Sequence, residues 1–328
     1  MRSLLTFVLA WILVIPSIVS AQVAPGNPSR DTVATAIPGV IAAGTKIEFL
    51  DDGYQGTEGP IALPDGSVVF TETQRNRLMR IDQDGNGSRW LFNTNGANGL
   101  AFDSQGRLIA VQTVPGKTAV AVIYPPGQEK VLSNNYKGKP YGRPNDLVVD
   151  KKGGVYFTDP GPNVPAGQSY PADALPPAVY YIPPGGESIQ VATDIARPNG
   201  IQLSPDERIL YVNDSRGEYL IAYDIQSDGT LRNKRNFAKY VGVTREGGQI
   251  TSGADGLAVD NEGRVYTTSN AGIDVFSPQG QHLGTIPVSL RPQNLAFSGK
   301  DKKTLYIVGR GATFRVQMLA QGYMGRVK

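Results

Sequence analysis

The chain contains no cysteine and a single histidine, His282. Without cysteine there can be neither a disulfide framework nor a thiolate metal site. His282 follows a turn-like stretch at residues 278–281 and has no second histidine to support it. A serine–histidine–aspartate triad or a histidine-rich metal centre therefore has too few residues to be built. Catalysis, if there is any, must use other side chains.

Long apolar runs are also scarce. One run spans residues 4–19, follows the basic Arg2 and ends at the small residues Ser20 and Ala21. This pattern predicts a secretory signal peptide at residues 1–21, and the alternative is an uncleaved membrane anchor. Residues 22–44 are expected to form an extended, weakly ordered leader. We expect a mature protein in the periplasm or the medium, free of the membrane.

Charge of one sign is not in excess. The 328 residues include 32 Lys and Arg against 29 Asp and Glu, a net charge of +3, and the basic residues are scattered. Nucleic acid is therefore not expected as a partner. We expect a small-molecule ligand and a monomer. The 39 glycines and 24 prolines are typical of a turn-rich all-β chain.

A short phrase recurs six times along the chain. In each copy a polar residue precedes an apolar strand, a tight turn and a second strand, as in residues 255–266. We name the six polar residues the anchor residues: they are Glu58, Asn98, Asn145, Asn199, Asp255 and Gln293. They lie 40, 47, 54, 56 and 38 residues apart, a spacing typical of repeated supersecondary units.

The repeats predict an all-β fold, a six-bladed β-propeller over residues 45–328, because each unit holds strands and turns without helical periodicity. The last repeat is one strand short. A strand at residues 46–50 is expected to pair with residues 313–317 and complete the sixth blade, which would close the ring.

In a propeller the innermost strands run along the central channel, so the anchor residues should form a ring at one mouth. Every anchor carries a side-chain oxygen. Two carboxylates with amide oxygens suit a hard divalent ion, Ca²⁺ in the first place, with Zn²⁺, Mn²⁺ or Mg²⁺ as alternatives. Two other interpretations stay open: Asn-Gly and Asp-Gly pairs as turn formers, and a ring that only satisfies backbone groups.

Other features lie close to the anchors in sequence. Arg-Pro precedes three of them, and Arg143 is the best candidate for a contact with substrate. Asp159 and Asp214 end second strands and could be turn caps or an outer shell of the metal site. Two long loops, residues 161–177 and 240–253, are expected to form the rim of a pocket.

Several motifs together resemble those of the gluconolactonase family, which includes senescence marker protein (regucalcin). They are Glu58-Gly59-Pro60, Arg143-Pro144-Asn145-Asp146, Tyr156-Phe157-Thr158-Asp159-Pro160, Pro198-Asn199-Gly200 and Asp255-Gly256. The likeness covers about residues 46–318. It implies a propeller with one divalent metal in its channel that hydrolyses sugar lactones.

Carried over by motif, the metal ligands would be Glu58, Asp255 and one or both of Asn145 and Asn199. The metal would polarise the lactone carbonyl and activate water. Asp255 would act as the base or as a ligand alone, while Arg143, Asn98 and Asn145 would hold the substrate.

Two other functions stay open. The chain is also similar to diisopropyl-fluorophosphatase-type hydrolases around Asp255, which would imply a phosphotriester or ester substrate. Those enzymes place a histidine where this chain has Gly309-Arg310, and many gluconolactonase-like proteins place one at Gln112. The second alternative is an exported propeller that binds a ligand without catalysis, because a fold alone does not imply a function.

Overall fold

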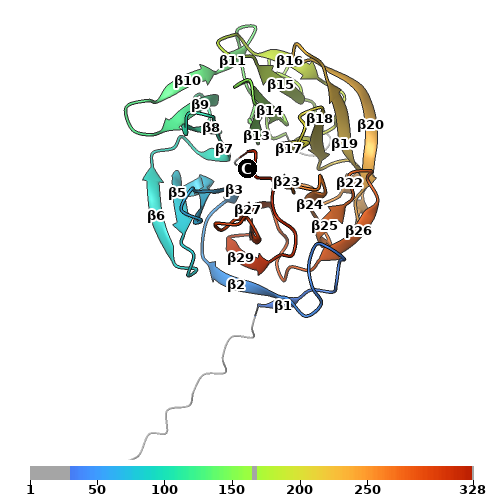
Figure 1. The fold of residues 1–328 in the computed structure, drawn as a ribbon. Helices are drawn as coiled ribbons and strands as arrows, with labels where there is room; N and C mark the ends of the chain where they lie inside the picture. Colours follow the sequence, from blue (N-terminus) through green and yellow to red (C-terminus); the bar gives the residue numbers. More distant parts are fainter. Residues whose placement is uncertain (1–29, 165–167, 327–328) are drawn as a thin grey trace, which may run out of the picture.

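A computed structural model describes residues 30–164 and 168–326. Small antiparallel sheets stand around a central axis as the six blades of a β-propeller (Figure 1). The predicted fold is confirmed. The predicted signal peptide, residues 1–21, lies outside the described residues. Nowhere in the described part of the chain is there a helix with the length and apolarity needed to cross a membrane.

Five blades contain four strands and the sixth contains these four and a short fifth; the strands are named here from the channel outwards. Blade 1 is β3 (Thr57–Ala62), β4 (Val68–Glu72), β5 (Arg77–Ile81) and β6 (Gly87–Phe92). Blade 2 is β7 (Ala97–Phe102), β8 (Leu108–Gln112), β9 (Ala119–Tyr124) and β10 (Lys130–Ser133). Blade 3 is β13 (Leu147–Val149), β14 (Val155–Asp159), β15 (Ala178–Ile182) and β16 (Ile189–Ala192).

The second half of the ring repeats this order. Blade 4 is β17 (Pro198–Leu203), β18 (Ile209–Asp214), β19 (Tyr219–Ile225) and β20 (Leu231–Lys239). Blade 5 is β23 (Leu257–Val259), β24 (Val265–Ser269), β25 (Gly272–Phe276) and β26 (His282–Ile286). Blade 6 is β27 (Asn294–Ser298), β28 (Thr304–Gly309), β29 (Ala312–Gln317) and β2 (Lys46–Asp52).

Three short elements lie between blades or strands. Two are hairpins, β11 (Asn135–Tyr136) with β12 (Lys139–Pro140) and β21 (Thr244–Glu246) with β22 (Gln249–Thr251). The third is a 3₁₀ turn, η1 (Thr73–Arg75).

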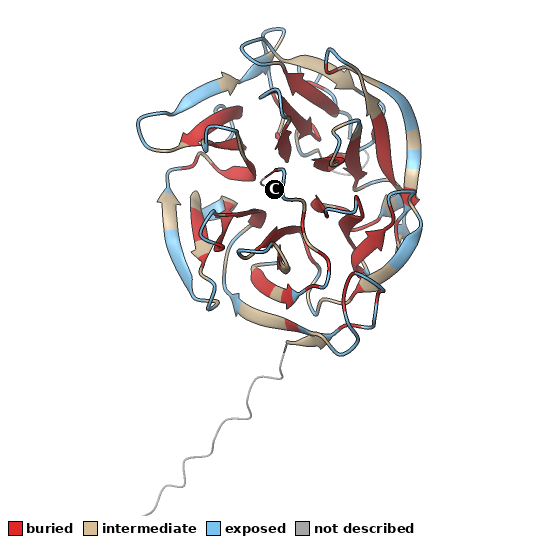
Figure 2. Cartoon of the chain, viewed as in Figure 1, coloured by how far each residue is buried: buried red, intermediate tan, exposed pale blue. Residues whose placement is uncertain are grey.

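Apolar side chains between neighbouring blades form the core. The inner strands are buried on both faces, whereas the outermost strands expose one face to solvent (Figure 2). Between blades 2 and 3, for example, Val111 and Val122 pack with Phe157 and Tyr180, whose rings stack 5.2 Å apart. Because each apolar layer is shared by two blades, no blade has a core of its own, and the ring positions all six innermost strands together.

The ring closes as predicted, through pairing of β2 with β29. The expectation for residues 22–44 is wrong where the structure describes them. β1 (Thr32–Val33) adds a fifth strand to the sixth blade. Ile37, Val40 and Ile41 are fully buried against blades 5 and 6. These apolar residues hold the segment in place because their burial removes hydrocarbon surface from water.

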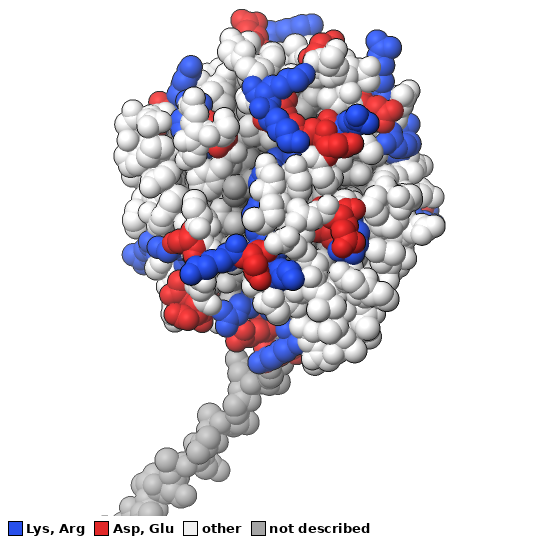
Figure 3. All heavy atoms as spheres, in the orientation of Figure 1, with Lys and Arg blue, Asp and Glu red and all other residues white. Residues whose placement is uncertain are grey.

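The C-terminal residues cover one end of the channel. The Tyr323 N–H donates to the carbonyl of Val259, and Arg326 Nη2 donates to the carbonyl of Leu203. Val259 and Leu203 are the last residues of the innermost strands β23 and β17. The anchor residues lie where such strands begin, so the C-terminal residues cover the opposite end of the channel. The last described residues lie near the centre of the ring in Figure 1, and Lys, Arg, Asp and Glu are interspersed on the face shown in Figure 3.

Candidate active site

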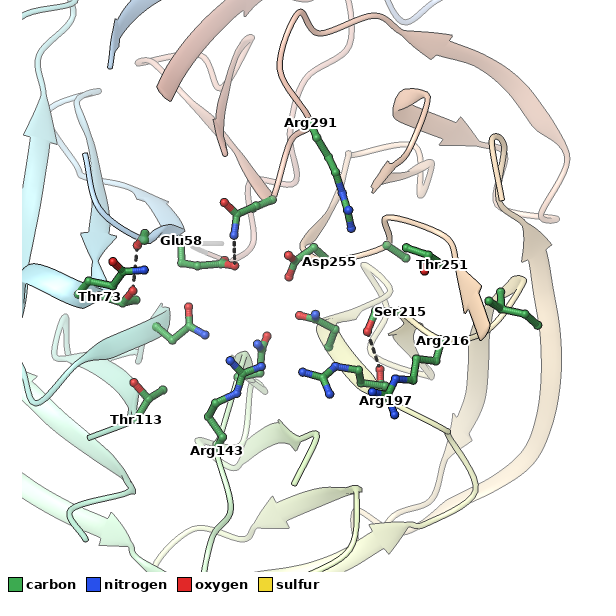
Figure 4. Close-up of a pocket in the computed structure, with 18 of the residues that line it drawn as sticks. Glu58, Thr73, Thr113, Arg143, Arg197, Ser215, Arg216, Thr251, Asp255 and Arg291 are labelled. Carbon is green, nitrogen blue, oxygen red and sulfur yellow. Dashed lines mark hydrogen bonds between the residues drawn. The ribbon is translucent and has the colours of Figure 1, made fainter. Parts of the chain in front are cut away.

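All six anchor residues line one cavity of about 420 Å³ at the mouth where the innermost strands begin (Figure 4). Glu58 and Asp255 lie in its middle, and Arg143 and Arg291 extend toward it from opposite sides. Gln249, Ile250 and Thr251 of the loop at residues 240–253 also contribute to the wall. The sequence-derived ring therefore comes together in space.

Glycines after the anchors let neighbouring anchors approach one another closely. The Gly200 N–H donates to the carbonyl of Asp255 at 2.8 Å, and the Gly256 N–H donates to that of Gln293 at 2.7 Å. A Cβ atom on Gly200 would lie 2.1 Å from the carbonyl oxygen of Asp255. These glycines belong to the ring of inner strands, so the turn-former interpretation does not explain them.

Glu58 and Asp255 form a carboxylate pair at the cavity, in which Glu58 is buried and Asp255 is half-buried with a buried Oδ1 atom. Glu58 is 7% exposed and accepts a hydrogen bond from Asn294 Nδ2 at 3.1 Å. Burial, and next the charge of Asp255, raise its pKa well above the usual range. Burial raises the pKa of Asp255 to about 7, although the positive charges of Arg291 and Arg143 oppose this shift. The charge of each carboxylate disfavours ionisation of the other, so a cation between them would stabilise both.

Several oxygens of the ring lack a donor. Asn98 Oδ1, Asn199 Oδ1 and Asp255 Oδ1 are buried and accept no hydrogen bond from the described residues. A buried acceptor without a partner is costly, and three such oxygens around one cavity indicate a ligand that binds oxygen. Together with Glu58 they match the donors that a hard divalent cation prefers. The residues present therefore fit the expected metal.

The donor set is mixed rather than purely acidic. Among the described residues, no three His, Cys, Asp or Glu side chains gather as a metal cluster. Amide oxygens must therefore complete the coordination. Asn145 and Asn199 both line the cavity. Asn98, which we assigned to substrate binding from the sequence, also has a buried Oδ1 without a hydrogen-bond donor, as Asn199 does.

Asp159 fixes the loop that carries Arg143. Its carboxylate accepts hydrogen bonds from the backbone N–H of Gly142, Arg143 and Gly161, at 2.7, 2.8 and 2.9 Å. The Nε of Arg143 is buried without an acceptor. Its guanidinium group is therefore held at the cavity with hydrogen-bonding capacity to spare.

Asp214 fixes the loops of Arg197 and Arg216 in the next blade. It accepts hydrogen bonds from the N–H of Arg197 at 3.0 Å and of Arg216 at 3.1 Å. Both aspartates thus act as caps of cavity loops. From the other long loop, Asn163 Oδ1 accepts a hydrogen bond from Arg197 Nη2 at 3.2 Å.

Three supporting residues were missed from sequence. Asn294 holds Glu58, Thr268 Oγ1 accepts the N–H of Asp255 at 2.8 Å, and Asn213 Nδ2 donates to the carbonyl of Asp255 at 2.8 Å. Only Asn294 had a signal, since it occupies the position after an anchor where four other repeats have glycine.

Comparison with known proteins agrees with this geometry. The family model described as SMP-30/gluconolactonase/LRE-like region matches residues 56–310. A gluconolactonase of Zymomonas mobilis is 28% identical over 91% of this chain and 90% of its own length. The lactonase drp35 of Staphylococcus saprophyticus is 30% identical over 75% of this chain and 67% of its own.

Solved structures show the same relationship. A gluconolactonase of Xanthomonas campestris superimposes with a TM-score of 0.74 at 29% identity, covering 90% of this chain and 99% of that one. Regucalcin of Agrobacterium tumefaciens, a calcium-binding protein, superimposes with a TM-score of 0.67 at 18% identity over 84% and 94%, and shares the fold. The resemblance read from the motifs is confirmed, and the chain belongs to the SMP-30/gluconolactonase/LRE-like family.

Proposed function

We propose that this protein is a metal-dependent hydrolase that opens sugar lactones. Its family and the two lactone-hydrolysing relatives support the reaction class. The observation that carries the proposal is the set of orphaned oxygens of Asn98, Asn199 and Asp255 beside the buried carboxylate of Glu58. A binding propeller has no need of such a costly arrangement.

Glu58, Asn145, Asn199 and Asp255 would hold the divalent cation, with Ca²⁺ as the first choice because every donor is an oxygen. When bound, the cation supplies Lewis acidity toward the lactone carbonyl. Glu58 and Asp255 contribute the negative charge, and the two amides contribute neutral oxygens.

The remaining chemistry belongs to the chain itself. Asp255 would accept a proton from the attacking water. Its pKa of about 7 describes the site without the cation, whose positive charge lowers it. Arg143 donates hydrogen bonds to the substrate from its loop, and Asn98 and Asn145 orient the ring hydroxyls. The alternative in which Asp255 is a ligand only remains within this proposal.

The test is hydrolysis of glucono-δ-lactone by the purified protein before chelation, after chelation and after Ca²⁺ is restored. We expect activity to disappear with the chelator, to return with the ion and to be absent in Asp255→Ala. Asp84→Ala, in the exposed turn between β5 and β6, is the matched control and should behave as the wild type.

Two outcomes would contradict the proposal. Tight metal binding without turnover would favour a phosphotriester or ester substrate, to be tested with the same variants. Absence of both metal binding and turnover would leave a propeller that binds its ligand without catalysis.

We also propose that the protein is exported to the periplasm or medium and acts there as a monomer. The support for export is the apolar segment at residues 4–19, which follows Arg2 and ends at the small residues Ser20 and Ala21. Mass spectrometry of the secreted protein should find Gln22 as its first residue, and light scattering should give the mass of one chain. A retained N-terminus would contradict export.

A further inference from the structure

The wall of the cavity is rich in arginine. Its lining includes four arginines, Arg143, Arg197, Arg216 and Arg291, but neither lysine nor histidine. They come from three blades: Arg143 precedes β13, Arg197 precedes β17, Arg216 lies between β18 and β19, and Arg291 precedes β27. Figure 4 shows Arg143 and Arg197 on one side of the cavity and Arg291 on the other.

These arginines have no carboxylate partner. Among the described residues no ion pair within 4.0 Å involves any of the four, whereas Arg77, Arg264 and Arg315 elsewhere in the chain each meet a carboxylate. Asp159 and Asp214 lie behind the loops, but their oxygens accept backbone N–H groups. Apart from the hydrogen bond of Arg197 Nη2 to Asn163, the guanidinium donors therefore remain available to a ligand.

The positive charges also gather on one side of the cavity. Figure 4 shows Arg143, Arg197 and Arg216 there, with Arg291 across from them. Like charges brought together destabilise a protein unless a bound anion compensates for them.

A neutral sugar lactone would leave this repulsion in place. Glu58, Asp255 and Asp146, which lies behind the ring, carry the negative charge nearest the centre. A divalent cation would balance two of those three charges and leave the four guanidinium groups largely uncompensated. Arginine is also the side chain best shaped for bidentate recognition of carboxylate or phosphate.

We propose that the substrate is a sugar lactone that carries an anionic group, a carboxylate or a phosphate. The lactone carbonyl lies at Glu58 and Asp255, and the anionic group lies among Arg197, Arg216 and Arg291. This inference rests on the proposed lactonase function and names the substrate class of the same site.

The test compares lactones that differ in one group. D-glucaro-1,4-lactone and D-glucono-1,4-lactone differ only at C6, which is a carboxylate in the first and a hydroxymethyl group in the second. D-glucono-1,5-lactone and its 6-phosphate form the second pair and distinguish phosphate from carboxylate. We expect kcat/KM to be about 10- to 100-fold higher for at least one anionic member, as one or two charge-assisted hydrogen bonds would give.

Single substitutions assign the preference to the arginines. Arg197→Gln, Arg216→Gln and Arg291→Gln should each reduce the ratio of kcat/KM for the anionic lactone over its neutral partner by about tenfold or more. The exposed Arg89 on β6 supplies the matched control, Arg89→Gln, which should leave the ratio unchanged. Added salt should reduce the ratio as well, because it screens the attraction.

Failure of the inference and failure of the proposed function give different results. Equal turnover of both members of each pair, with ratios unchanged in the arginine variants, would overturn the inference and leave the lactonase intact. If no lactone is hydrolysed, the proposed function fails, and calorimetric titration with D-glucarate decides on the anion site. Binding that is lost in the arginine variants supports the site, and no binding overturns it.

Discussion

At the scale of single residues, environment separates aspartates that look alike in sequence. Asp255 and Asp159 both lie at strand ends beside a channel loop. Asp159 is saturated by three backbone N–H groups, whereas Asp255 keeps a buried oxygen without a donor. The first is therefore suited to hold a loop and the second to bind a ligand.

Metal binding should depend on pH through Asp255. Burial raises its pKa to about 7, so the metal-free folded state holds a proton that the cation must displace. We expect Ca²⁺ affinity, measured by calorimetry, to fall about tenfold per pH unit below neutrality. The stability of the metal-free protein changes with pH in the opposite direction to its Ca²⁺ affinity. The stabilisation that comes from the raised pKa of Asp255 is present in acid and is lost as pH rises through about 7.

The substitution Asp255→Asn supplies the control for this pH dependence. It removes the titrating group, so the metal-free protein should lose that part of its pH-dependent unfolding. An affinity for Ca²⁺ that stays constant from about pH 5 to neutrality in the wild type would exclude Asp255 as a ligand.

Removing the carboxylate of Asp159 should affect both stability and activity. Asp159→Ala leaves three backbone N–H groups without an acceptor, one of them buried and two half-buried, and we expect a loss of about 2 to 4 kcal/mol in the free energy of unfolding. Because the loop carries Arg143, kcat/KM should fall as well. Urea unfolding and steady-state kinetics measure the two effects.

Asp159→Asn keeps one acceptor oxygen and should restore part of both losses. If Asp159→Ala lost stability with an unchanged kcat/KM, the loop would not be positioning Arg143 for substrate.

At the scale of elements, the start of each inner strand is defined by close backbone contact. Gly59 and Gly200 lie against the next anchor so tightly that a Cβ atom would be 2.1 Å from its carbonyl oxygen in both cases. The polar-residue and glycine pair thus serves two purposes, since the side chain points into the cavity while the glycine lets the blades meet.

Gly200→Ala should therefore disturb the site through the backbone. The new methyl group must push the carbonyl of Asp255 away and break the 2.8 Å hydrogen bond from Gly200. We expect a loss of about 1 to 3 kcal/mol in unfolding free energy, and metal affinity should fall as the Asp255 ligand moves.

Gly106→Ala is the control for this change. Gly106 has open space around it but a positive φ of 73°, so its replacement should cost about 1 kcal/mol without altering metal affinity. Equal metal affinity in both variants would show that the close contact does not position Asp255.

The sequence predicts the blades and the ring well because both follow from a local repeat. Each anchor residue holds the same position at the start of an innermost strand. Side chains at the same position of these strands lie at the same end of the central channel. Asn213 and Thr268 could not be found in this way, because each contacts an anchor backbone through folded geometry. The arginine wall was only partly visible, since Arg216 reaches the cavity from a loop outside the repeated phrase.

At the scale of the whole molecule, both chain ends stabilise the ring. β2 completes the sixth blade, and the segment before it buries Ile37, Val40 and Ile41 against blades 5 and 6. The N–H groups of Leu319 and Ala320 donate to the carbonyl of Val40, so the segment before β2 also contacts the segment after β29. From sequence we predicted a weakly ordered leader here, because the apolar residues among Gly, Ala and Pro lack strand periodicity.

This contact makes the N-terminal segment part of the stability of the propeller. Ile41 is 1% exposed, and Ile41→Ala should lower the free energy of unfolding by about 2 to 5 kcal/mol through the cavity that it leaves. Val33 in β1 is 60% exposed, and Val33→Ala should change it by less than about 0.5 kcal/mol. Urea unfolding followed by tryptophan fluorescence measures both. Equal stability of Ile41→Ala and Val33→Ala would mean that the propeller is stable without contacts from this segment. The predicted difference would show that the N-terminal segment helps to close the ring in addition to the β2–β29 pairing.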